Sequence, residues 1–119
     1  MKNNEVRTAI QELIVQYETN THSGYANSCP LCKIFKTNDI YSGHHKRDCG
    51  RCPNVTFGSF IGCVDREKYT KLYWDDKNNN PFLAEFWTKV LALIAENNKQ
   101  YTLSITKQKQ IKAIAENYR

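Results

Sequence analysis

Two pairs of cysteines limit what this chain can fold into more than any other feature of its sequence. Each pair has the spacing C-x2-C, and 16 residues separate the two pairs. A C-x2-C turn places two thiolates on one side of a tight loop, so two such turns can enclose one Zn2+ ion tetrahedrally. The sequence therefore predicts a structural zinc site, with no open position for catalysis, whose ligands are Cys29, Cys32, Cys49 and Cys52.

A fifth cysteine leaves the fourth ligand open. Cys63 lies 11 residues after Cys52. It is either a small buried core residue, which is the interpretation we favour, or it replaces Cys52 as the ligand.

The length of the chain makes a metal useful. A protein of 119 residues and 13.9 kDa forms one domain with a modest core, and a bound ion adds folding energy to it. No stretch approaches the roughly 20 apolar residues of a membrane span, and the N-terminus leads into an amphipathic pattern rather than a signal peptide. The predicted location is the cytoplasm, where paired cysteines are more often metal ligands than disulfides.

Hydrophobic periodicity predicts a mainly α fold. Apolar residues recur at spacings of three and four in three long segments and one short one. The predicted helices are residues 3–19, 66–74, 81–97 and 105–118. Short apolar pieces alternate with turn-forming residues between the cysteine pairs, which predicts a small irregular or β, ribbon-like centre.

The sequence predicts a single domain, 1–119, which consists of three regions. These regions are an N-terminal amphipathic helix (1–20), a zinc-knuckle region (29–63) and a helical region (65–119).

Local signals mark the helix starts and the core. Asp65 is the expected cap of the short helix, and Asn80 the expected cap of the helix that begins at Pro81. The broad apolar stripe of residues 81–97 predicts the central core element. Its expected central side chains are Phe86, Trp87 and Leu91.

Basic residues form two groups in a chain of formal net charge +5. The first lies in and between the cysteine pairs and consists of Lys33, Lys36, Lys46, Arg47 and Arg51, with Phe35 and Tyr41 among them. Such residues either bind phosphates, with the aromatics stacking on unpaired bases, or offset the charge of about −2 on a Zn(Cys)4 centre. The second group comprises Lys99, Lys107, Lys109, Lys112 and Arg119, and we interpret it as a solvated helix face.

Two catalytic functions are alternatives to a binding function. Adjacent His44 and His45 are compatible with an HNH-like metal nuclease, but that site needs another His or Asn on the following helix, and no histidine follows His45. The run Cys29-Pro-Leu-Cys32 also has the form of a dithiol redox turn. That turn needs a preceding strand, and the preceding segment, 19–28, is polar and rich in turn-forming residues.

One resemblance covers about residues 29–74. The run Cys29-Pro-Leu-Cys32, Cys49-Gly-Arg-Cys52-Pro53 and Gly62-Cys63, followed by Tyr69, Tyr73 and Trp74, resembles small phage and prophage proteins with the signature CxLC…CxxCP…GC. The inter-knuckle loop is longer here, and the flanking helices are not covered. The resemblance implies cysteines that bind metal and a phage origin, with the host cytosol as location, but no activity.

These observations together predict a non-enzymatic, zinc-stabilised binding protein. The expected partner is RNA, DNA or a nucleic-acid-bound host protein, and the phage-like setting includes inhibition of a host RNA-guided defence nuclease. The alternatives are a protein-only inhibitor or adaptor without nucleic-acid contact, and the HNH-like nuclease that uses His44 and His45.

Overall fold

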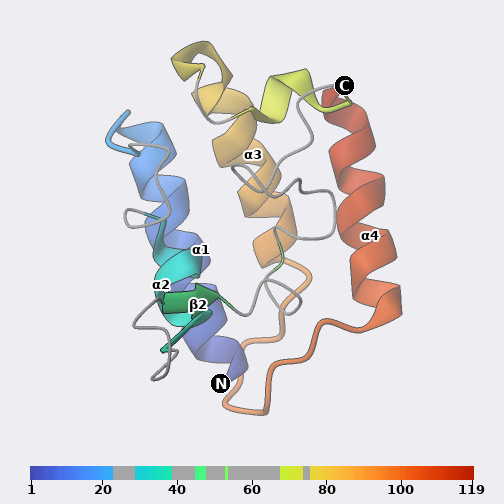
Figure 1. Cartoon of the computed structure of the whole chain (residues 1–119). Coiled ribbons are helices and arrows are strands. Elements are labelled where there is room, and N and C mark those ends of the chain that lie inside the picture. Colours follow the sequence, from blue (N-terminus) through green and yellow to red (C-terminus); the bar gives the residue numbers. More distant parts are fainter. Residues whose placement is uncertain (23–28, 39–44, 48–52, 54–67, 74–75) are drawn as a thin grey trace.

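The chain folds into a mainly α structure, as the sequence predicts. The computed structural model describes residues 1–22, 29–38, 45–47, 53, 68–73 and 76–119. Within these residues the elements are α1 (Asn3–Glu18), α2 (Pro30–Ile34), β1 (Lys36–Asn38), β2 (His45–Arg47), η2 (Thr70–Leu72), η3 (Lys77–Asn79), α3 (Asn80–Leu91), α4 (Ile105–Ala115) and η4 (Glu116–Tyr118). Helix α3 lies between α1 and α4, and the short α2 packs on α1 (Figure 1).

The core lies where α1 and α3 face each other. The predicted apolar stripe of α1 is buried along its whole length, because its members recur every three or four residues on the side that meets α3. Phe86 and Trp87 of α3 are 0% and 1% exposed, which confirms two of the three predicted central side chains. Leu91 is only partly buried and packs against the core.

Helix α1 ends in a Schellman motif. Asn20 has φ 56°, a left-handed conformation that asparagine tolerates better than most residues. The N–H groups of Asn20 and Thr21 donate to the carbonyls of Tyr17 and Gln16. The Asn20 side chain also accepts a hydrogen bond of 2.7 Å from Asn80 Nδ2, so the end of α1 is fixed to the start of α3.

Helix α3 begins one residue earlier than predicted, at the expected cap itself. Asn80 is its first residue rather than its N-cap, and Pro81 follows within the first turn. Asn79 occupies the cap position, but its side-chain oxygen accepts no capping bond. Its Nδ2 donates instead to the carbonyls of Thr70 (2.7 Å) and Tyr73 (3.1 Å). These bonds use carbonyls near η2 that a longer helix would satisfy internally.

The short predicted helix at 66–74 is correspondingly reduced. In the described part of this segment the chain forms only the single 3-10 turn η2, and its C-cap Tyr73 is extended. The expected cap, Asp65, lies outside the described residues.

Helix α3 ends at Leu91, six residues before the predicted end at 97, because tertiary contacts outweigh helix propensity there. Arg7 of α1 donates from Nη1 to the carbonyls of Leu91 (3.0 Å) and Ile94 (2.6 Å). Carbonyls at the end of a helix lack intrahelical partners and carry partial negative charge, so a guanidinium satisfies both requirements.

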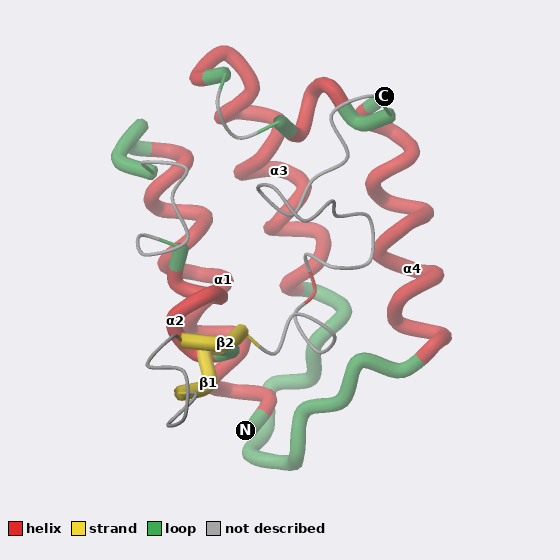
Figure 2. Tube along the Cα trace, viewed as in Figure 1, coloured by secondary structure: helices red, strands yellow, loops and turns green. Residues whose placement is uncertain are grey.

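The segment that follows α3 is hydrogen-bonded to the N-terminus of the chain. Asn3 N–H donates to the Lys99 carbonyl (2.9 Å), and Tyr101 N–H donates to the Met1 carbonyl (2.9 Å). The side chains of Asn3 and Asn97 add a hydrogen bond of 2.8 Å. We call residues 97–101 the strap; Figure 2 shows this loop passing the N-terminus before it climbs to α4.

Helix α4 starts at its predicted residue. Ser104 caps it by accepting from Lys107 N–H (3.1 Å). Its end continues as η4, where Tyr118 hydroxyl donates to Glu85 Oε1 of α3 (2.7 Å). This hydrogen bond is the main reason that the pKa of the Glu85 carboxyl lies below its ordinary value.

We predict that Arg7→Met will destabilise the fold, although methionine keeps helix propensity and apolar bulk. The carbonyls of Leu91 and Ile94 lose a charged donor, so the free energy of unfolding should fall by about 1.5–3 kcal/mol. Chemical denaturation followed by circular dichroism measures the change. The control is Gln11→Met at an exposed position of α1, which should leave the midpoint unchanged. Equal midpoints for the two variants would contradict the role of Arg7.

Candidate metal centre and basic surfaces

The first cysteine pair lies on α2. Cys29 is the N-cap residue, in an extended conformation, and its carbonyl accepts from Lys33 N–H (3.1 Å). Pro30 follows in the first turn, where its fixed φ suits a helix start and its missing N–H leaves no unsatisfied donor. Cys32 is the third residue of the helix. Both predicted ligands therefore belong to a single helical turn.

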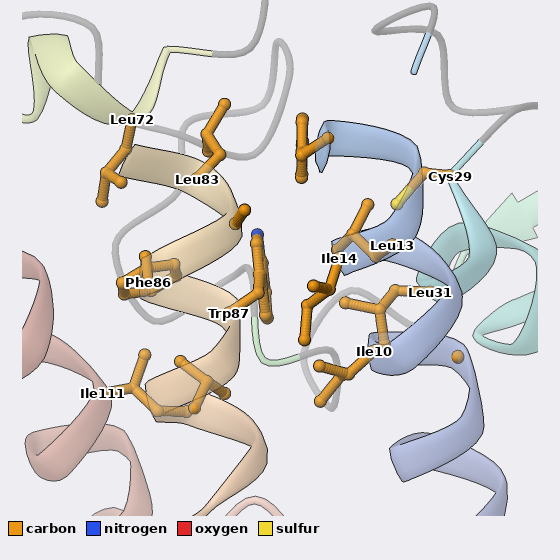
Figure 3. Close-up of a cluster of buried hydrophobic side chains, with 14 of the residues drawn as sticks. Ile10, Leu13, Ile14, Cys29, Leu31, Leu72, Leu83, Phe86, Trp87 and Ile111 are labelled. Atoms are coloured by element: carbon orange, nitrogen blue, oxygen red, sulfur yellow. The ribbon is translucent and has the colours of Figure 1, made fainter. Parts of the chain in front are cut away.

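Cys29 is anchored in the hydrophobic core. It is 7% exposed and belongs to the same buried cluster as Leu13 of α1 and Leu31 of α2. Figure 3 shows Cys29 beside α1 at the edge of this cluster. A metal ion bound to Cys29 would thus be tied directly to the packed helices.

The rest of the predicted zinc site is not described. Cys49, Cys52 and the alternative ligand Cys63 lie outside the described residues, and of Cys32 only the backbone is described. Within the described part of the chain, no group of three or more His, Cys, Asp and Glu side chains is placed to hold a metal. The four-cysteine zinc site therefore stays a prediction, with one ligand located in the core.

The first basic group surrounds a short antiparallel ribbon. Lys33 is exposed near the end of α2. In the ribbon, the backbone register places Lys36 of β1 opposite Arg47 of β2, and Lys46 opposite Thr37. Arg51 and Tyr41 lie outside the described residues. Three of the five predicted phosphate-binding residues therefore occupy one six-residue ribbon.

Phe35 does not provide the predicted stacking surface. It is only 2% exposed, and its ring packs against Tyr101 of the strap with centroids 5.8 Å apart. A base cannot reach a ring enclosed in this way, so this part of the sequence interpretation is wrong. The periodicity of a five-residue helix is too short to distinguish a buried aromatic from an exposed one.

The histidines give no described catalytic cluster. His45 begins β2 opposite Asn38, and His44, the other residue that the nuclease hypothesis requires, lies outside the described residues. His22 stacks on Tyr17 with ring centroids 4.6 Å apart, and burial lowers the pKa of its imidazole. A dithiol redox turn also needs a helix on its C-terminal side, and α2 begins directly after Cys29. The segment that precedes Cys29 is outside the described residues.

The second basic group divides into engaged and exposed members. Lys107 lies 5.0 Å from the Tyr101 ring centroid and donates to the Thr102 carbonyl (3.0 Å), and burial lowers its pKa. Arg119 forms an ion pair with Glu116. The remaining members, Lys99, Lys109 and Lys112, are exposed. The sequence alone does not distinguish the engaged members from the exposed ones, because no local pattern shows that Tyr101 lies beside Lys107.

Comparison with known proteins gives no match: no family model, curated protein or solved structure matches the chain. In the described part of the chain, no helix has the length and apolar character needed to cross a membrane.

We predict that Cys29→Ala will abolish zinc binding and unfold the cysteine-rich segment. Native mass spectrometry should find one zinc per chain in the wild type and none in the variant. Zinc binding contributes on the order of 10 kcal/mol to folding in such sites, so the melting temperature should also fall. Alanine keeps the position small and apolar. A purely structural Cys29 would therefore tolerate this change, and retained melting temperature would contradict the metal assignment.

Cys63→Ser is the matched control for ligand identity. If Cys63 is a buried core residue, this variant keeps one zinc per chain, whereas Cys52→Ser loses it. The reverse result would make Cys63 the fourth ligand.

Proposed function

We propose that this chain is a non-enzymatic, zinc-stabilised binding protein that engages nucleic acid or a nucleoprotein. The observation that carries the proposal is the register of the ribbon, which sets Lys36 opposite Arg47 and Lys46 opposite Thr37, three residues after the exposed Lys33. The ribbon follows α2, which packs on α1 and includes the buried Cys29 at its cap. The backbone that carries these basic residues therefore continues directly from a segment that is packed on the core.

Zinc is proposed as the element that makes this segment rigid. Helix α2 has five residues and the strands three each, which is too short for any of them to be stable alone. Cys29 and Cys32 in one turn supply half of a tetrahedral thiolate site, and the second pair would supply the other half across the ribbon. When bound, the ion would act as a structural crosslink. The residues of the chain would do the binding.

Charge favours an anionic partner for the ribbon. Like charges at opposing positions of an antiparallel pair destabilise it by a few tenths of a kcal/mol or more. A phosphate near Lys36 and Arg47 would reverse the sign of this interaction and release counterions. The burial of Phe35 removes one stacking surface, so the expected contacts are with the backbone of the nucleic acid rather than with its bases.

The finer proposal concerns the biological target. A closed site of four thiolates leaves no coordination position for a reacting water, which supports binding rather than catalysis. In a phage-like setting, a rigid basic surface on a small protein suits inhibition of a host RNA-guided defence nuclease, because charge complementarity would direct it to a nucleic-acid or nucleoprotein surface. The alternative is a protein-only inhibitor or adaptor.

We predict that reversing charge at Lys46, Arg47 and Arg51 to glutamate will weaken nucleic-acid binding. Loss of three phosphate contacts should reduce the slope of log K against log salt by about 2 to 3, and charge repulsion should reduce the affinity further. Fluorescence anisotropy with labelled RNA and DNA oligonucleotides over a salt series measures both quantities.

The control reverses three exposed lysines elsewhere, Lys2, Lys71 and Lys77, and so makes the same change in net charge. The control should bind far better than the triple variant of the ribbon. Equal binding by both would contradict the proposed surface. A wild-type chain that binds no nucleic acid but forms a stable complex with a protein would establish the protein-only alternative.

A further inference from the structure

The segment between Glu96 and Glu116 contains four lysines and no acidic residue. Its other side chains are largely amides and hydroxyls. It comprises the whole strap, the connection to α4 and all of α4 itself. This segment therefore concentrates positive charge along one edge of the helical layer, beside α3 (Figure 1).

One exposed line of side chains runs along α4. Ile105, Lys109 and Lys112 are spaced at i, i+4 and i+7, which places them on the same side of the helix. We call these three residues the α4 stripe. All three are exposed, and Ile105 is 71% exposed. Among the described residues no carboxylate forms an ion pair with either lysine.

Fold stability does not account for the α4 stripe. Lys89 of the neighbouring helix α3, by contrast, is paired with Glu85 (3.1 Å). Lys109 and Lys112 are three residues apart, where like charges repel by a few tenths of a kcal/mol. Ile105 leaves apolar surface in water, which gains nothing for the folded chain. Each of these features is explained if another molecule covers the stripe.

Helix α1, on the other side of α3, has exposed carboxylates. They belong to Glu5, Glu12 and Glu18, and α3 separates α1 from α4 (Figure 1). A polyanion is therefore attracted to α4 and repelled by these three carboxylates of α1. The occupant favoured by this arrangement is negatively charged.

A chain of contacts links the ribbon region to α4. Phe35, the residue before β1, packs on Tyr101 at 5.8 Å, and Lys107 of α4 lies over the same Tyr101 ring at 5.0 Å. The ribbon and the first turns of α4 are thus joined through one buried tyrosine.

We propose that the α4 stripe is a second contact surface for the sugar-phosphate backbone of a nucleic acid held at the ribbon. The inference rests on the proposed function, because it extends the same partner onto a second element. Lys109 and Lys112 act as point charges on phosphates, and Ile105 packs against the sugars. The stripe has no aromatic side chain and no bidentate group, so it contributes affinity without reading sequence.

The test is the double variant K109Q/K112Q, which keeps side-chain length and helix propensity at exposed positions. Binding to a 20-base-pair duplex and to a single strand of the same sequence is measured by fluorescence anisotropy across a salt series. Loss of two phosphate contacts should reduce the slope of log K against log salt by about 1.8 for the duplex, or by about 1.4 for the single strand. The arm with the larger loss identifies the form of nucleic acid that reaches α4.

The matched control is K2Q/K77Q, which removes the same charge from exposed positions outside α4. Its slope should equal that of the wild type. If the wild type binds and K109Q/K112Q keeps the wild-type slope, the α4 inference is overturned, the proposed function stands, and an acidic protein surface becomes the better candidate partner for α4. If the wild type binds neither oligonucleotide, both the proposed function and this inference fail.

Discussion

The guanidinium of Arg7 on the carbonyl end of α3 is the interaction on which the helical frame depends. It joins α1 to α3 through the Leu91 and Ile94 carbonyls, at the point where α3 stops and the strap begins. The strap can then bond back to Asn3, and α4 can return along the other side of α3. Without this contact, the apolar pattern of residues 92–97 favours a longer helix, which would carry the strap away from the N-terminus.

Residue patterns predicted the helices well because their information is local. The periodicity of α1, the burial of Phe86 and Trp87 and the start of α4 at Ile105 all follow from spacings within one segment. The errors occur where a distant partner decides. Arg7 bonds the carbonyls at the end of α3 from 84 to 87 residues away in the sequence. Asn79, at the N-cap position of α3, makes no capping bond and donates to the carbonyls of Thr70 and Tyr73. No local pattern contains those partners.

In the candidate sites, too, local sequence patterns predict part of the arrangement and distant contacts decide the rest. Cysteine spacing is enough to predict four zinc ligands, and the burial of Cys29 agrees with an anchored centre without identifying the ion. The two groups of basic residues were visible in the sequence, but their roles were not. Tyr101 contacts one residue from each group's surroundings, because its ring packs on Phe35 and lies under Lys107. A buried tyrosine in a connecting loop has no distinctive sequence signal.

The strap has a consequence for how the chain is made. Its contacts with the N-terminus close a loop of 94 residues between Asn3 and Asn97, and α1 packs mainly on α3. On a ribosome that adds about 5–20 residues per second, the apolar face of α1 therefore waits on the order of 4–16 seconds for α3 to be synthesised. During that interval α1 depends on chaperones or on α2 for cover. Folding of the helical frame consequently waits until α3 has been synthesised.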